Sequence, residues 1–315
     1  MRYALSRGNF MNRRTFSQTI TGAAIGAAAW MDRRAEAFPF DMRERMGTPY
    51  SVSIMLWTVF RKLPFEERLE KVAEAGYRNV ELVGEYHREH WSDDEFNRVN
   101  AKRKELGITF DTTAGLRHGV GNPNDREAML ADLRNELPIM ERLECPACII
   151  MSGNVVPGMP REVQHQSCIE GLKRAAEVIE GKQIAGKPVR LLLENIDPEE
   201  NPRYYLQSVN EGFEIIRAVN HPQVQMLYDF YHEQIAEGNL IEKLEKNIQY
   251  LGLVHIADVP GRHRPGTGEI NYVNIYKKLA ELRYDKIVAM EFLPLGDPVS
   301  ELRAAAQEAL SAGRA

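Results

Sequence analysis

The sequence predicts a (β/α)₈ barrel, in which eight parallel strands alternate with eight helices. From residue 50 onward, apolar strand-like runs alternate with segments of helical period about eight times over about 260 residues, the size and rhythm of such a barrel. Helical segments of the first half open with acidic residues, which helix dipoles favour. Several apolar runs end in polar residues followed by loops, and barrels carry their chemistry at that end of the strands.

The first half of the barrel is expected to hold four strand–helix pairs. Its strands are predicted at residues 51–57, 79–84, 108–115 and 148–154. The intervening helices are expected to begin near Phe65, Asp93, Asp125 and Glu162.

The second half repeats the scheme. Its strands are predicted at residues 189–196, 224–230, 250–258 and 286–292. Its helices are expected to begin near Ser208, Leu240, Val273 and Asp297.

A doubly wound open sheet is the main rival of the barrel. No predicted strand is followed by a G-x-G-x-x-G loop, and the glycine-rich stretch that starts at Gly261 contains prolines and lacks that spacing. The nucleotide-binding form of that fold therefore loses support. No linker divides the remainder, so residues 50–315 are assigned to one barrel domain.

The first 37 residues resemble a twin-arginine export signal. Arg13 and Arg14 precede a weakly apolar, Ala/Gly-rich run, and residues 35–37 form an A-x-A-like cleavage site. The apolar part, residues 20–31, is shorter than the roughly 20 residues that span a bilayer. We expect residues 1–37 to engage the twin-arginine export machinery, which gives a periplasmic protein, membrane-tethered if the signal is uncleaved, with residues 38–49 as a linker. The alternative is a tail with a chance arginine pair and a cytoplasmic protein.

Charge and cysteine content exclude other classes of protein. Residues 1–37 carry six Arg and two acidic residues, so the rest holds 34 basic and 43 acidic residues, a formal charge of −9. A nucleic-acid surface is therefore disfavoured. Cys145 and Cys148 form a C-x-x-C beside an apolar strand, and with Cys168 they are expected to be buried thiols rather than a redox pair.

Four consecutive predicted strands of the second half end in side chains of the kind that bind metals. These residues are Glu194, Asp229, His255 and Glu291. A single acid at the end of a buried strand is explained by a salt bridge, but four on adjacent strands of a barrel converge on one point. Three carboxylates and one imidazole suit one divalent ion, Mn²⁺ or Mg²⁺, better than zinc, since no Cys stands at these strand ends.

Other polar and aromatic residues near the strand ends allow two interpretations. Glu81 ends the second strand, either supporting the site or pairing with a basic residue. Trp57, Tyr86 and Trp91 follow the first two strands, where they form a pocket wall or part of the core. Asp258 is expected to orient the loop that follows the seventh strand rather than to bind metal.

Four segments of the chain read SIMLWTVFRKLPFEERLEKVAEAGYRNVEL, LLLENI, YDFYHEQIAEGNL and HIADVPGRHRPGTGEINY. They resemble the hydroxypyruvate isomerase family, within the xylose isomerase-like barrel superfamily. The similarity extends from about Ser51 to about Gly296, and the long match in the last segment makes it specific. It implies the same barrel fold and a divalent-metal isomerase of a small hydroxy-carbonyl or sugar substrate.

The resemblance assigns roles to individual residues. Glu194 and Glu291 match glutamates that are both metal ligands and proton donor or acceptor, and Asp229 and His255 match the other two ligands. Contacts to the substrate fall on His232 and, in the following loop, on Arg262 or His263.

The implied reaction converts hydroxypyruvate to 2-hydroxy-3-oxopropanoate through an enediolate. His255 stands where bacterial hydroxypyruvate isomerases are expected to carry Gln, and His is the choice of related epimerases, so a ketose 3-epimerase or another sugar isomerase remains the alternative. An exported, non-catalytic sugar-binding barrel is a second alternative. A metal-dependent endonuclease would need more metal ligands and a basic groove. A homo-oligomer is compatible with the sequence.

Overall fold

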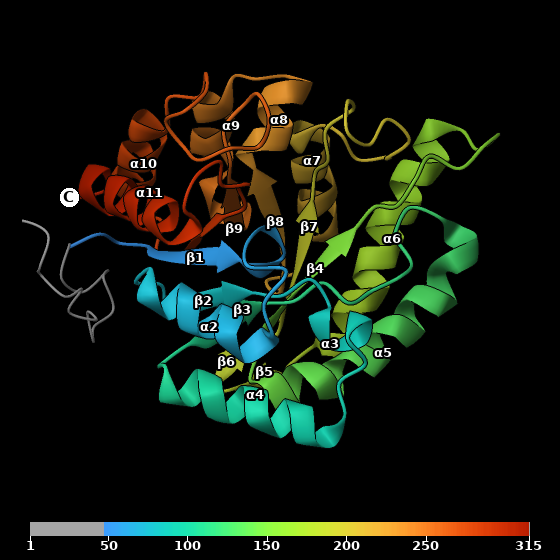
Figure 1. Cartoon of the computed structure of the whole chain (residues 1–315). Helices are drawn as coiled ribbons and strands as arrows, with labels where there is room; N and C mark the ends of the chain where they lie inside the picture. Colours follow the sequence, from blue (N-terminus) through green and yellow to red (C-terminus); the bar gives the residue numbers. More distant parts are fainter. Residues whose placement is uncertain (1–46, 315) are drawn as a thin grey trace, which may run out of the picture. The chain divides into compact units, whose positions relative to one another are not determined.

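The computed structural model describes residues 47–314, so the predicted signal segment, residues 1–37, and residues 38–46 of the linker lie outside the described residues. The described part contains an eight-stranded parallel sheet surrounded by helices (Figure 1). Its strands are β1 (Ser51–Met55), β2 (Asn79–Glu81), β3 (Thr109–Thr112), β4 (Ala147–Met151), β7 (Arg190–Glu194), β8 (Val224–Asp229), β9 (Leu251–Ile256) and β10 (Ile287–Met290).

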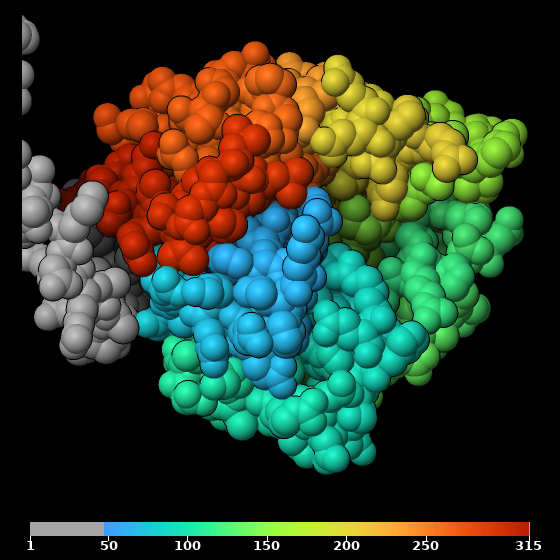
Figure 2. Space-filling view, viewed as in Figure 1, coloured from blue at the N-terminus to red at the C-terminus, as the bar shows by residue number. Residues whose placement is uncertain are grey.

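The strands follow the order β3-β2-β1-β10-β9-β8-β7-β4, and every pair is parallel. The two ends of this order meet at Thr113, which donates from its amide to the carbonyl of Ala147 (3.0 Å) and accepts from the amide of Ile149 (2.7 Å). The sheet is therefore a nearly closed barrel. Figure 2 shows the blue segment around β1 next to the red C-terminal segment, in keeping with the pairing of β1 with β10.

One main helix follows each strand. These helices are α2 (Phe65–Glu74), α4 (Asp93–Glu105), α5 (Arg126–Leu143), α6 (Arg161–Ile179), α7 (Val209–Val219), α9 (Leu240–Asn247), α10 (Tyr272–Glu281) and α11 (Pro298–Ala312). Smaller elements complete the fold: α3 (Glu85–Arg88), α8 (Phe230–Ala236), the 3₁₀ turns η2 (Leu56–Thr58), η3 (Pro123–Asp125) and η4 (Ile248–Tyr250), and the hairpin β5 (Gln183–Ile184) with β6 (Lys187–Pro188).

Two apolar cores follow from strand alternation, because successive side chains of a strand point to opposite faces of the sheet. The larger core lies between the strands and the helices, and a small one fills the barrel interior. The interior core contains Met55, Ala147, Ile149, Leu192, Leu227, Leu253 and Ala289. It forms a packed support beneath the ends of the strands.

The predicted (β/α)₈ barrel is confirmed. Each predicted strand overlaps an observed one, and each main helix begins within one residue of its predicted start. Cys145, Cys148 and Cys168 are buried free thiols, as expected. Between residues 47 and 314, no helix is both long enough and apolar enough to cross a membrane.

Candidate metal centre

The four metal-type residues come together at the carboxyl ends of the strands. Glu194 and Asp229 are the last residues of β7 and β8, His255 is the penultimate residue of β9, and Glu291 directly follows β10. Each offers a ligand atom, and these four atoms lie within 4.8 Å of one another. All four side chains are buried. The parallel strands therefore build a single compact donor set from residues up to 97 positions apart.

The imidazole of His255 lies at the centre of this set. Its Nδ1 is 3.1 Å from Oε2 of Glu291, 3.3 Å from Oε1 of Glu194 and 3.7 Å from Oδ2 of Asp229. Within residues 47–314, neither Nδ1 of His255 nor Oε2 of Glu291 has a hydrogen-bond partner, although both atoms are buried. Buried polar atoms are normally satisfied. The set contains three carboxylates and one imidazole. Unsatisfied ligand atoms that face one another in such a set fit a divalent cation.

Glu81 fixes the orientation of this imidazole through the other ring nitrogen, Nε2. Its Oε2 lies 2.8 Å from Nε2 of His255, and both side chains are buried. A carboxylate at this nitrogen favours the tautomer that carries the proton on Nε2, which leaves the lone pair of Nδ1 for a metal. Of the two interpretations of Glu81, the structure supports the one in which it serves the site.

Charge within the cluster shifts the pKa values in different directions. Burial raises the pKa of Glu194. Burial would also raise the pKa values of Asp229 and Glu291. The charges of His255 and Arg262 outweigh the effect of burial at both residues, and His232 adds to them at Asp229. Both pKa values therefore lie below their usual range. Burial would lower the pKa of His255, but Glu81 and Glu291 raise it well above 6.5. This density of negative charge attracts a cation to the site.

A second group of side chains adjoins the metal centre through His232. The backbone amide of His232 donates to Oδ1 of Asp229 (2.9 Å), since Asp229 caps α8. Its Nδ1 lies 2.5 Å from Oδ2 of Asp197, and its Nε2 lies 2.8 Å from Nη2 of Arg262. A guanidinium only donates, so Nε2 accepts and the proton of the ring sits on Nδ1. The ring is thereby held between the carboxylate of Asp197 and the guanidinium of Arg262.

Arg262 connects this group to the metal centre. Its Nη1 lies 3.2 Å from Oε1 of Glu291, and its Nη2 lies 3.3 Å from Oε2 of Glu200. The guanidinium also stacks on the ring of Tyr231, 4.6 Å from its centroid. Asp197, Glu200 and His232 could by composition form a second metal site, but the cation of Arg262 at 2.8 Å from His232 disfavours another positive ion there.

Asp197 and Glu200 were missed as site residues in the sequence. The available signal is their position: they follow Glu194 by three and six residues in the loop after β7. Asp197 is also fixed by two backbone amides, those of Glu199 (2.8 Å) and Glu200 (2.7 Å), which accounts for an acid with a defined orientation there.

The remaining residues divide between the site and the frame. Trp57 belongs to the site, since its Nε1 donates to Oε1 of Glu291 (2.9 Å). Tyr86 and Trp91 pack with Phe65 or Phe96 in an aromatic cluster and belong to the frame. The ring of His263 is held by the carbonyl of Leu293 (3.0 Å from Nδ1), so the structure brings Arg262, rather than His263, against the metal centre.

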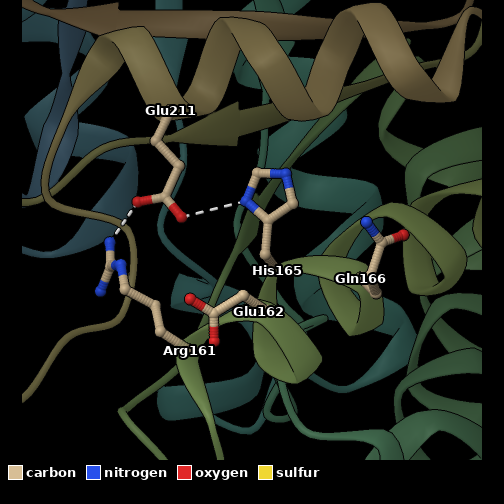
Figure 3. A pocket seen from close by; sticks show the side chains of 5 residues that line it. All are labelled: Arg161, Glu162, His165, Gln166 and Glu211. Carbon is tan, nitrogen blue, oxygen red and sulfur yellow. Dashed lines mark hydrogen bonds and ion pairs between the residues drawn. The ribbon is translucent and has the colours of Figure 1, made fainter.

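A separate hollow of about 230 Å³ lies between the starts of α6 and α7 (Figure 3). Arg161 and His165 both point at the carboxylate of Glu211, with His165 Nδ1 3.1 Å from Oε1, and the hydroxyl of Tyr205 donates to the same oxygen (2.5 Å). These groups satisfy one another and join two helices. They add nothing to the metal centre.

Fold and sequence place the chain in a known class of barrels. The family described as "Xylose isomerase-like TIM barrel" matches residues 69–312, and the chain belongs to this family. Among its relatives, the 2-oxo-tetronate isomerase of Haemophilus influenzae is 31% identical over 254 residues, covering 78% of this chain and 95% of the relative. The hydroxypyruvate isomerase of Escherichia coli is 28% identical over 248 residues, covering 77% and 93%.

Solved structures show the same fold. D-psicose 3-epimerase from Clostridium cellulolyticum, solved with D-tagatose, superposes with a TM-score of 0.68 at 22% identity and covers 84% of this chain and 98% of that one. The IOLI protein, solved with a zinc atom bound, has a TM-score of 0.67 at 17% identity and covers 84% and 95%.

Proposed function

We propose that this isomerase is metal-dependent and acts on a small 3-hydroxy-2-oxo acid, converting hydroxypyruvate to 2-hydroxy-3-oxopropanoate. Metal dependence is supported by the donor set of Glu194, Asp229, His255 and Glu291. Nδ1 of His255, which has no hydrogen-bond partner among residues 47–314, lies at the centre of this set. The substrate class comes from the relatives, because hydroxypyruvate and 2-oxo-tetronate share a carboxylate, a 2-carbonyl and a 3-hydroxyl. Mn²⁺ or Mg²⁺ suits a donor set dominated by oxygen.

The reaction moves one proton between neighbouring carbons. A base removes a proton from C3, an enediolate forms, a proton is delivered to C2, and the hydroxyl proton passes from the oxygen on C3 to that on C2. A divalent cation held by Glu194, Asp229, His255 and Glu291 would supply positive charge near the substrate oxygens. Glu194 and Glu291 border the place where those oxygens would lie, so they can take and return the carbon-bound proton.

The side chains around Glu291 support this division of labour. Trp57 donates to its Oε1 and Arg262 forms an ion pair with the same oxygen, while Oε2, which has no hydrogen-bond partner among residues 47–314, faces the cluster. His232, which is fixed by Asp197 and Arg262 and lies beside Asp229, would contact the substrate as part of the pocket wall. Arg262 would balance the charge of a carboxylate on the substrate.

The alternative is a ketose 3-epimerase, which needs the same ligands and the same pair of glutamates; His255 is the residue in favour of it. Purified protein, loaded with Mn²⁺ and incubated in D₂O with hydroxypyruvate or D-fructose, separates the two by NMR. We expect deuterium at carbon and product formation with hydroxypyruvate. Exchange with the ketose alone would overturn the proposed substrate, and binding of either compound without exchange would indicate a non-catalytic barrel.

Variants test the roles of the two glutamates. Glu194→Gln and Glu291→Gln should each lower turnover by at least about 10²-fold, within the range of general acid–base catalysis. Glu245→Gln is the matched control, because Glu245 pairs with Lys278 on the outer helices and is remote from the strand ends. Full activity of either site variant would refute the proton-transfer assignment.

A further inference from the structure

The carboxylate of Asp258 is the hub of the β9–α10 connection. It is fully buried and lies two residues after β9. Its Oδ2 accepts from the backbone amides of Gly266 (2.9 Å) and Gly268 (2.8 Å), and its Oδ1 accepts from those of Val259 and Ile270 (both 3.0 Å). Four backbone donors from a span of twelve residues thus converge on one side chain. A buried carboxylate satisfied in this way stabilises the conformation that brings its donors together.

The loop is built to approach this carboxylate closely. A Cβ atom at Gly268 would overlap with the carbonyl of Val259 and lie 2.6 Å from Oδ1 of Asp258, so only glycine fits. Gly266 has φ +82°, which other residues rarely adopt. The amide of Glu269 donates to the carbonyl of Val259 (2.8 Å) and closes the loop a second time. The glycines of this segment therefore serve its internal packing.

The main chain of Asp258, beside the loop that its carboxylate closes, sets the backbone of Arg262. The amide of Asp258 donates to the carbonyl of His263 (2.8 Å), and the amide of His263 returns a bond to the carbonyl of Asp258 (3.3 Å). Arg262 lies between these partners with φ 56°, a left-handed conformation that non-glycine residues rarely adopt. Its carbonyl accepts from the amide of Leu293 (2.6 Å). The surrounding bonds hold Arg262 in a conformation that it would not adopt alone.

We infer that Asp258 is a positioning residue for Arg262: its carboxylate folds residues 259–270 so that the guanidinium reaches Glu291 and His232. This inference rests on the proposed function for the role of Arg262 at the substrate. Asp258 itself touches none of the four proposed metal ligands through any bond of its side chain among residues 47–314. It acts on the reaction only through the loop.

Asp258→Asn tests the inference, because the amide group keeps the shape but faces two of the backbone donors with a donor of its own. Hydrogen exchange of residues 259–271, measured without substrate, should become faster while the strands keep their protection. The kcat/KM for hydroxypyruvate should fall about 10²-fold, as a misplacement of about 1 Å can cause. The affinity for Mn²⁺ should not change, since the ligands stand on the strands.

Two further variants separate positioning from a general loss of stability. Gly268→Ala disturbs the same hub from the opposite side and serves where Asp258→Asn does not fold. Asn271→Ala removes the cap of α10, at which Oδ1 accepts from the amide of Asn274 (3.1 Å), and leaves the hub intact, so it should retain activity. In an Arg262→Lys background, Asp258→Asn should cause little further loss, because both changes act through one group.

The outcomes are distinct. Unchanged exchange in residues 259–271 of Asp258→Asn, or a full additional loss in the Arg262→Lys background, would overturn the positioning role. Faster exchange with a displaced guanidinium in a crystal structure of Asp258→Asn would support that role even if the wild-type protein turned over no 3-hydroxy-2-oxo acid; the latter result would overturn the proposed function alone.

Discussion

Oε2 of Glu81 lies 2.8 Å from Nε2 of His255, although 174 positions separate the two residues in the chain. Glu81 ends β2 and His255 stands near the end of β9, so the barrel itself brings them into contact across its interior. With Nε2 engaged by Glu81, Nδ1 of His255 faces the carboxylates of Glu194, Asp229 and Glu291. The tautomer that a metal needs is thus imposed by a residue outside the donor set.

Loss of the charge at Glu81 should weaken metal binding. We expect Glu81→Gln to lower the affinity for Mn²⁺ about tenfold, at the low end of the effect of residues that support metal ligands. Isothermal titration calorimetry with Mn²⁺, on protein first stripped of metal by a chelator, measures this affinity. Asp111→Asn is the matched control, because Asp111 is a buried acid near Glu81 with no bond to His255 among the described residues. Equal affinity in Glu81→Gln and wild type would contradict the role of Glu81.

The indole of Trp57 should matter for turnover. Trp57→Phe keeps an aromatic ring but removes the bond from Nε1 to Glu291, and hydrogen bonds to charged groups contribute about 1.5–3 kcal/mol. We expect kcat/KM to fall about tenfold or more. The same change at Trp91, whose Nε1 donates to the exposed Glu89, should leave kcat/KM unaltered. Equal losses in both variants would show that the effect is not specific to Glu291.

The stability of the barrel should depend on Asp111. Burial, with a contribution from Glu81, raises the pKa of Asp111 well above 3.8. The folded state then binds this proton more tightly than the unfolded state. The contribution is fully present below the unfolded pKa of about 3.9 and is lost as the pH rises toward the folded pKa, by about 1.4 kcal/mol per unit.

Asp111→Asn removes that dependence. Its free energy of unfolding in urea should exceed that of the wild type at pH 7, and the gap should narrow as the pH falls toward about 4. A difference in free energy of unfolding that is constant with pH would show that ionisation of Asp111 does not destabilise the fold. A variant that is less stable than the wild type at pH 7 would show the same.

Export should depend on the arginine pair, a proposal that concerns residues outside the described part of the chain. Arg13→Lys with Arg14→Lys should retain the protein in the cytoplasm, whereas Arg33→Lys with Arg34→Lys, a second pair after the apolar run, should not. Fractionation of cells followed by immunoblotting distinguishes the compartments. A periplasmic Lys-Lys protein would refute the twin-arginine proposal.

The barrel could be predicted because its strands are short apolar runs with a definite period. Strand ends were predicted too long, as at residues 79–84, where pairing stops at Glu81 although the apolar pattern continues. The helices α3 and α8 were not expected. They are short, and α8 starts directly after Asp229, which is both the last residue of β8 and the cap of the helix.

The convergence of the four strand ends could also be predicted, since it follows from parallel strands alone. The contact between Glu81 and His255 could not be predicted, because a contact across the barrel leaves no local pattern in the sequence. The choice between Arg262 and His263 depends on the left-handed backbone at Arg262, which directs its side chain to Glu291 while His263 turns to Leu293. Nothing in the residue types at these two positions specifies that backbone.

We propose that the donor set of Glu194, Asp229, His255 and Glu291 binds a divalent ion that enables proton transfer at carbon. The most direct measurement follows hydroxypyruvate by NMR in D₂O with protein stripped by a chelator and then reloaded with Mg²⁺, while metal content is measured in parallel. We expect no exchange in the stripped protein and, on reloading one ion per chain, deuterium at carbon together with 2-hydroxy-3-oxopropanoate. Exchange at the same rate in stripped and reloaded protein would contradict this proposal.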